Sequence, residues 1–138
     1  MQVRDWTGES VDAHVVSSGL VLMAHATGEV RADFLTGPLE HWTANSMTDP
    51  DSLARRLDEA RRAGFVWVYE EMSEGLNSVA APIVNPAGTA IAAVHAHGPS
   101  YRFPGPGAAA SVAAAVVDTA QRISERLAGR NRPAASDP

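Results

Sequence analysis

The feature that most constrains the fold of this chain is a pair of apolar stretches, residues 78–84 and 89–97, separated by Asn-Pro-Ala-Gly at 85–88. Turn-forming residues between two apolar runs are typical of a β-hairpin. Residues 90–97 are mostly small and apolar on both faces, which predicts a central, buried strand. The chain is therefore expected to contain an antiparallel sheet.

Helices and further strands are expected around this hairpin. Residues 65–69 are rich in β-forming types and predict a strand, and residues 2–6 are a candidate for another. Capping residues, apolar spacing or alanine content predict helices at 17–24, 28–35, 48–63 and 108–128. Because no linker or repeat divides the chain, we expect one domain at 1–129 and a disordered tail at 130–138.

The helix at 48–63 has the clearest signals. Thr48-Asp49-Pro50-Asp51 supplies a cap, a first-turn proline and a first-turn acid, all of which favour a helix start. Gly64 is suited to end the helix in a left-handed conformation. Leucine and alanine recur at helical spacing on the face expected to be buried, at Leu53, Leu57 and Ala60. The basic residues of this segment are expected to face solvent: Arg55, Arg56, Arg61 and Arg62.

Composition excludes several classes of function. The chain has 138 residues, enough for one domain with a core, and a net charge of −5. This acidic balance creates no overall field that would attract nucleic acid. The chain has no cysteine, which excludes disulfides and thiolate chemistry. Its longest apolar runs are too short to span a membrane.

His95 and His97 are the most distinctive polar residues of the predicted hairpin. Because side chains alternate along a strand, both should project from the same face. Such a pair can contact an anion when protonated, bind a metal when neutral, or be packed with satisfied ring nitrogens. A zinc site would need a third ligand, for which His14 is the natural candidate, with Glu70 or Glu71 behind it.

Signals for catalysis are weak. If Glu70 and Glu71 both belong to a strand, they point to opposite faces and cannot share a substrate, so a hydrogen-bonding or structural role is expected. The Ser17-Ser18-Gly19 segment lies near His14, but there is no Gly-x-Ser-x-Gly elbow and no identifiable orienting acid. We therefore predict no catalytic residue, no cofactor and no enzyme activity.

A series of short motifs runs along the chain. In order, it comprises His14, Ser17, Gly19, Leu22, Ala24, Thr48-Asp49, Arg62-Ala63-Gly64-Phe65, Glu70-Glu71, Gly75, Ser78-Val79-Ala80-Ala81-Pro82, Gly98-Pro99 and Arg102. This series resembles the effector-binding domain of IclR-type bacterial transcriptional regulators. The resemblance covers roughly residues 14–127.

The resemblance implies a GAF-like α/β fold with a curved antiparallel sheet, packed helices and a long C-terminal helix. It also implies a cytoplasmic regulator that forms dimers or tetramers and senses a small effector, often an organic acid or an aromatic breakdown product. Family members carry an N-terminal winged helix-turn-helix and early sheet strands that have no counterpart here. We therefore expect the C-terminal portion of a regulator, which by itself binds neither operator DNA nor a membrane.

The resemblance also implies an effector pocket. Carried over position by position, its lining is Ser17, Ser18, Val68, Leu76, Ser78, His95 and His97. Relatives often have aspartate at the position of Val68 and serines at those of His95 and His97. We expect an acidic ligand with a larger apolar body than the smallest family effectors. Its carboxylate would be held by Ser17 and Ser18, with the two histidines as further donors.

Two other functions stay open on the sequence alone. The first is a small GAF-like metal-binding or hydrolytic module that uses His14, His95 and His97. The second is a purely structural dimerisation domain. Bound zinc or substrate turnover would favour the first, and the failure of any ligand to stabilise the fold would favour the second.

Overall fold

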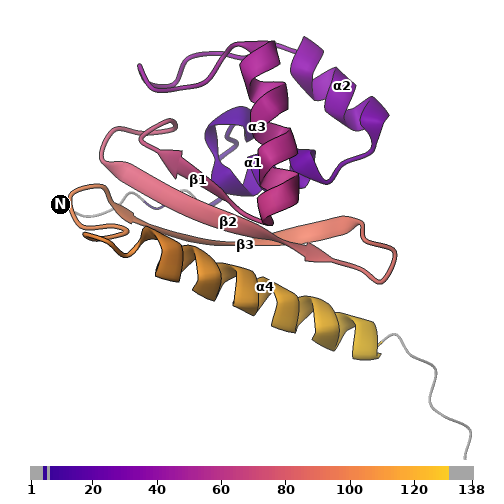
Figure 1. Ribbon diagram of the computed structural model, residues 1–138. Helices are drawn as coiled ribbons and strands as arrows, with labels where there is room; N and C mark the ends of the chain where they lie inside the picture. Colours follow the sequence, from indigo (N-terminus) through magenta and orange to yellow (C-terminus); the bar gives the residue numbers. More distant parts are fainter. Residues whose placement is uncertain (1–4, 6, 131–138) are drawn as a thin grey trace, which may run out of the picture.

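The computed structural model describes residue 5 and residues 7–130, which form three layers (Figure 1). The elements in chain order are the 3-10 helix η1 (Ala13–Val15), α1 (Ser17–Ala24), α2 (Gly28–Thr36), α3 (Pro50–Ala63), β1 (Val66–Tyr69), β2 (Leu76–Val84), β3 (Ala90–Pro99) and α4 (Ala109–Arg130). An antiparallel sheet lies in the middle, with α1 and α3 on one face and α4 on the other. The predicted α/β fold is confirmed.

Two predictions concern the ends of the chain. Apart from Asp5, the strand predicted at 2–6 lies outside the described residues. The tail predicted at 130–138 also lies outside them, apart from Arg130, whose backbone ends α4. Within the described part of the chain, no helix is long and apolar enough to cross a membrane.

Local signals place the helix ends where they were expected. The Asp49 carboxylate accepts a hydrogen bond of 2.9 Å from the Ser52 N–H, so that α3 begins at Pro50. Gly64 ends α3 with a φ of 82°, a conformation that costs glycine little. The side chain of Thr27 caps α2 in the same way as Asp49 caps α3.

The hydrophobic core consists of two clusters, one on each face of the sheet. Because side chains of β2 alternate, Ala80 faces α1 and α3, whereas Val79 and Ala81 face α4. One apolar stripe of α4 packs on the sheet, and it consists of Val112, Val116, Ala120, Ile123 and Leu127. The buried members are Leu20, Val21, Ala24, Leu53, Leu57, Ala60, Val66, Val68 and Ala80 in the first cluster, and Val79, Ala81, Ile83, Ala113, Val116 and Ala120 in the second.

The central strand is β2, which pairs with β1 on one side and β3 on the other. The prediction that the second hairpin strand is central and buried is wrong, because β3 is an edge strand among the described residues. The small apolar residues of β3 are explained by burial on one of its faces. Val94 and Ala96 pack against the α4 cluster, whereas His95 and His97 are exposed on the opposite face.

Arg56 contradicts the prediction that the arginines of α3 all face solvent. Its Nη2 lies 2.8 Å from Oε2 of Glu71 and donates a 2.6 Å hydrogen bond to the carbonyl oxygen of Trp67. The side chains of Arg56 and Glu71 are 16% and 8% exposed, so this ion pair is largely buried. Spacing along α3 could not reveal it, because the partner comes 15 residues later, after β1.

The same ion pair closes the outer edge of β1. The Glu70 N–H bonds inward to the carbonyl of Leu76, so the backbone groups of Tyr69 and Trp67 point outward. Glu71 accepts a 3.1 Å hydrogen bond from the Tyr69 N–H, while Arg56 occupies the Trp67 carbonyl. Two of the outward groups that could pair with another strand are thus occupied, which makes this edge less available for pairing.

Replacing Arg56 with methionine should destabilise the domain by about 3 kcal/mol, because it leaves the buried Glu71 carboxylate without its partner. The matched control is Arg55→Met on the exposed face of the same helix, which should change stability by less than about 0.5 kcal/mol. Urea unfolding of the three proteins measures both effects. Equal stability of the two variants would contradict the role assigned to the ion pair.

Candidate ligand-binding site

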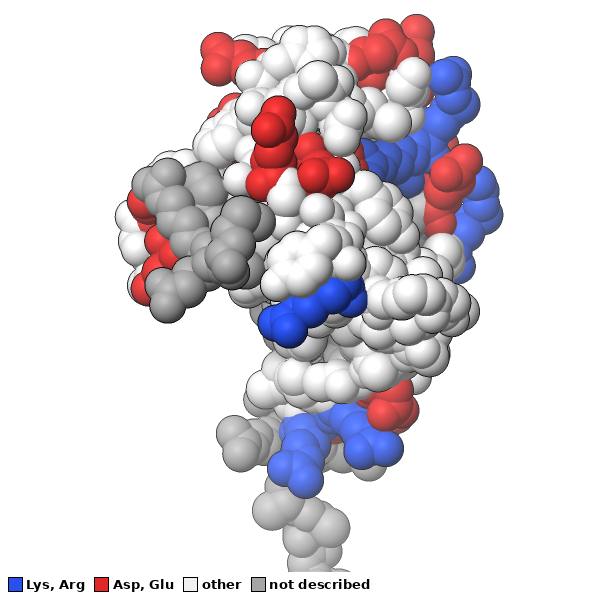
Figure 2. All heavy atoms as spheres, turned by 90° about the vertical axis from the view of Figure 1, so that its left-hand side faces the viewer, with Lys and Arg blue, Asp and Glu red and all other residues white. Residues whose placement is uncertain are grey.

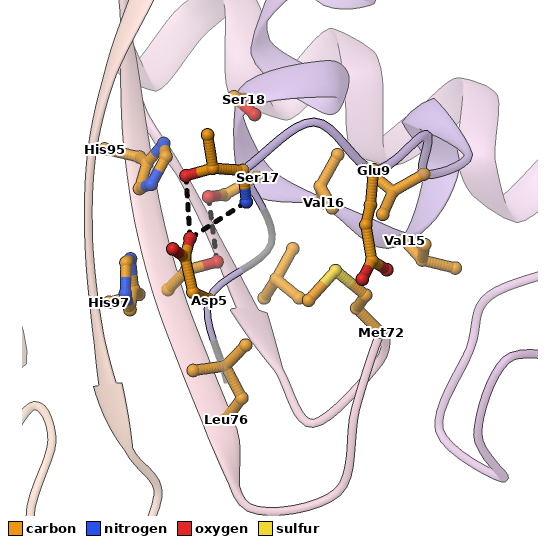
Figure 3. Close-up of a pocket in the computed structure, with 14 residues that line it drawn as sticks. Asp5, Glu9, Val15, Val16, Ser17, Ser18, Met72, Leu76, His95 and His97 are labelled. Atoms are coloured by element: carbon orange, nitrogen blue, oxygen red, sulfur yellow. Dashed lines mark hydrogen bonds between the residues drawn. The ribbon is translucent and has the colours of Figure 1, made fainter. Parts of the chain in front are cut away.

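A cavity of about 450 Å³ lies between the start of α1, one face of the sheet and the segment that precedes η1 (Figure 3). Small-molecule pockets typically have volumes of about 300–1,000 Å³, so the cavity can enclose a ligand of modest size. All seven residues predicted from the sequence line it: Ser17, Ser18, Val68, Leu76, Ser78, His95 and His97. That they contact a ligand stays a prediction.

Strand register brings the sheet residues of the cavity together. Val68 of β1 pairs with Ser78 of β2, which in turn pairs with His97 of β3. Directly paired residues of neighbouring strands project from the same face, so these side chains form a row across the sheet. Alternation along β2 and β3 then adds Leu76 and His95 to the same face.

The first turn of α1 forms the opposite wall. Val16 occupies the N-cap position, and no side chain there caps the helix. The Ser17 and Ser78 hydroxyls are 2.8 Å apart and share a hydrogen bond, which ties α1 to the centre of the sheet. The uncapped helix start and Ser18 therefore offer hydrogen-bond donors at the cavity wall.

Gly19 permits the close packing of this turn against η1. A Cβ atom at Gly19 would lie 2.5 Å from the carbonyl oxygen of Ala13 and 2.6 Å from its Cα. Any side chain would push η1 away from α1. Because Val15, at the end of η1, lines the cavity, this contact also determines where the cavity wall lies.

His95 and His97 project from β3 into the cavity (Figure 3). Their ring centroids are 5.3 Å apart, and both residues are partly accessible to solvent. Burial, and to a smaller extent the neighbouring His97, hold the pKa of His95 below its ordinary value. The imidazoles can therefore donate or accept hydrogen bonds toward a ligand, depending on protonation.

Reasoning from the sequence missed half of the described residues that line the cavity. The missed residues come mostly from the segment before α1, and they are Asp5, Thr7, Glu9, Val11, Val15, Val16 and Met72. This segment has neither helical nor strand periodicity that would indicate a buried side. Within this segment, Asp5 accepts hydrogen bonds from the Thr7 hydroxyl and N–H, at 2.7 Å and 2.9 Å. These bonds lower the pKa of the Asp5 carboxyl group.

The alternative metal or hydrolytic site is not assembled. His14 is buried with 1% exposure, and its Nε2 lies 2.7 Å from the carbonyl oxygen of Glu40 rather than in the cavity. The structure therefore does not bring it together with His95 and His97. Across residues 5 and 7–130, no three His, Cys, Asp or Glu side chains are grouped so that they could hold a metal ion.

The glutamate pair has the hydrogen-bonding role that was expected, although not from a strand. β1 ends at Tyr69, and Glu70 has a φ of 52° in the turn that follows. Glu70 accepts a 2.8 Å hydrogen bond from the Gly75 N–H, which closes that turn. Glu71 holds Arg56, as described above, and neither carboxylate lines the cavity.

A second, shallow cleft lies beyond the edge of β1. Trp67 and Tyr69 stack there with centroids 5.4 Å apart, and Tyr69 is 45% exposed. Arg55 and Arg56 also line it, but Glu71 already neutralises Arg56. This cleft lacks the enclosing walls of the cavity beside α1.

The sheet, its helical layers and the cavity define an α/β domain with a pocket of small-molecule size. The family model for the C-terminal domain of the bacterial transcriptional regulator IclR matches residues 1–125, and the chain belongs to this family. The resemblance inferred from the sequence is thereby confirmed. The proteins that the chain matches are transcriptional regulators, and the chain is a regulator domain rather than an enzyme.

Individual relatives agree with this assignment. The HTH-type transcriptional regulator BhcR of Paracoccus denitrificans is 31% identical over 118 residues, which are 85% of this chain and 42% of BhcR. The structure of RHA06195 from Rhodococcus sp. RHA1 has a TM-score of 0.87 at 28% identity, covering 96% of this chain and 54% of that one. An IclR homologue from Microbacterium hydrocarbonoxydans, complexed with 4-hydroxybenzoate, has a TM-score of 0.80 at 31% identity, covering 92% and 51%. The chain thus spans about half the length of these proteins.

Replacing Gly19 with alanine should destabilise the domain by about 1–3 kcal/mol, because the new methyl group would collide with the backbone of η1. Gly28→Ala is the control, since nothing lies within 4 Å of a Cβ at that helical position. It should leave stability unchanged or raise it by about 0.4–1 kcal/mol. Thermal unfolding of both variants tests this, and a Gly19→Ala protein as stable as wild type would contradict the close packing.

Proposed function

We propose that this domain senses a small carboxylic acid with an apolar body, which binds in the cavity between α1 and β3. The observation that carries the proposal is the convergence of hydrogen-bond donors and an apolar wall in one cavity of about 450 Å³. The complex of the Microbacterium homologue with 4-hydroxybenzoate supports an aromatic acid as the ligand class.

Different parts of the cavity wall suit the carboxylate and the apolar body of such a ligand. The uncapped start of α1, the hydroxyl of Ser18 and the imidazoles are donors for a carboxylate. Val68, Leu76 and Met72 supply apolar surface for a ring or an alkyl chain. Binding would therefore combine burial of apolar surface with a few directed hydrogen bonds, as in most small-molecule sites.

Signalling would proceed by a shift between conformations of the intact regulator. An effector that contacts α1, the segment before it and β3 favours the arrangement in which these parts are closest. In the parent protein, which we place in the cytoplasm, this change would alter the spacing of the DNA-binding domains. The chain has a net charge of −5, and on the face drawn in Figure 2 acidic side chains lie among the basic ones, so DNA contact is assigned to the rest of the regulator.

The same proposal includes self-association as a dimer or tetramer. The outer edge of β3 has no strand partner among the described residues, and its exposed residues include Ile91, at 53% exposure. Unpaired edges of this kind favour association with another chain. Sedimentation velocity over a wide concentration range should show at least a dimer, and a monomer throughout would contradict this part of the proposal.

A thermal-shift screen tests the ligand class. The panel contains 4-hydroxybenzoate, 3-hydroxybenzoate, benzoate and short aliphatic carboxylates, each tested at pH 6. A ligand present at a hundredfold its Kd should stabilise the domain by about 2.7 kcal/mol, which corresponds to a rise in Tm on the order of 10 °C. Failure of every acid to stabilise the protein would contradict the proposed function.

A pocket-filling variant locates the site in the same screen. Ser18→Trp places an indole in the cavity and should abolish the shift caused by the acid. Ser111→Trp, on the exposed first turn of α4, is the matched control and should keep the full shift. A shift that persists in a folded Ser18→Trp protein would place the ligand elsewhere.

A further inference from the structure

The described part of the cavity lining offers no permanently charged cation with which to bind an acid. None of the described residues that line it is lysine or arginine, and two of them, Asp5 and Glu9, are acids. Asp5 repels an incoming carboxylate, so a positive charge in the cavity would favour the binding of an acid. Among the described residues of the lining, a positive charge can come from an imidazole that gains a proton.

Two imidazoles are placed for this purpose. His95 and His97 lie on the same face of β3, and their ring centroids are 5.3 Å apart with an angle of 38° between the rings. Both project into the cavity from the β3 side, whereas Glu9 and Met72 lie on the opposite side in Figure 3. Because both residues are exposed, protons can exchange with solvent without any opening of the fold.

In the absence of ligand the surroundings of His95 disfavour its protonated form. Burial and the proximity of His97 keep the pKa of His95 below its ordinary 6.5. An anion placed against the two rings reverses this preference, because an opposite charge stabilises the protonated form.

Among the described residues, few other titratable groups lie near the pair. The elements packed against this face, α1 and β2, contain no titratable side chain. Asp5 and Glu9 face the cavity from the segment before η1. Asp5 is held in its ionised form by its hydrogen bonds from Thr7, so it remains a source of repulsion toward an acidic ligand over the neutral pH range.

We propose that His95 and His97 recognise the carboxylate of the effector, and that the pair takes up one proton when the acid binds. This inference rests on the proposed function, since it concerns the same cavity. It separates this chain from a site built on arginine or lysine, whose affinity for an acid would not depend on pH near neutrality. On this proposal the domain binds the effector anion together with one proton.

The sign of the pH dependence follows from this coupling. A carboxylic acid ionises near pH 4 and is an anion throughout pH 6–8. Over that range the complex holds more protons than the separate protein and ligand, so the affinity falls as the pH rises. The limit for one proton is about tenfold per pH unit, and we expect the Kd for 4-hydroxybenzoate to increase at least about tenfold from pH 6 to pH 8.

Isothermal titration calorimetry of the full chain measures the coupling directly. Titrations with 4-hydroxybenzoate at pH 7 in buffers of different ionisation enthalpy give the number of protons taken up. We expect between about 0.5 and 1 for the wild type. The neutral isostere 4-hydroxybenzamide should show no uptake and no change of Kd with pH. Uptake near zero with bound 4-hydroxybenzoate would overturn the inference.

Variants assign the uptake to the pair. His95→Gln/His97→Gln should bind the acid more weakly and without proton uptake, whereas His41→Gln, an exposed histidine away from the cavity, should behave as wild type. Unchanged uptake in the double variant would overturn the assignment. If that variant does not fold, the comparison of acid with amide on the wild type still shows whether proton uptake accompanies binding of the anion. Binding without uptake leaves the proposed function intact, whereas no binding of any acid at any pH contradicts both.

Discussion

The pocket depends on how closely the first turn of α1 approaches its neighbours. The absence of a side chain at Gly19 lets η1 pack against the helix backbone, and the hydrogen bond between Ser17 and Ser78 ties the same turn to the central strand. With α1 held between these two contacts, its uncapped start faces β3 across the cavity. A looser approach would separate the donors of the helix from the imidazoles of the sheet.

Much of this arrangement could be predicted because its signals are local. The caps of α3, the apolar stripe of α4 and the turn at 85–88 each depend on residues close together in the chain. Alternation along one strand was enough to place His95 and His97 on the same side. The family resemblance then supplied positions on α1, β1 and β2 that local patterns could not connect, and all of them line one cavity.

The errors share a physical origin in contacts between distant segments. Arg56 was assigned to solvent because its partner, Glu71, follows the next strand. β3 was assigned to the centre of the sheet because small residues suit burial on two faces, yet one of its faces packs on α4 and the other lines the cavity. The segment that contributes Asp5 and Glu9 carries no periodicity, so its position depends on the folded pocket itself.

The central claim is that an acidic ligand binds between α1 and β3, and backbone NMR during a titration with 4-hydroxybenzoate tests it most directly. The account predicts that the largest chemical-shift changes occur at Ser17, Ser18, Ser78, His95 and His97. Amides around Trp67 and Tyr69, in the cleft beyond β1, should change little. Changes concentrated at that cleft or along α4, with none at the five cavity residues, would contradict the account.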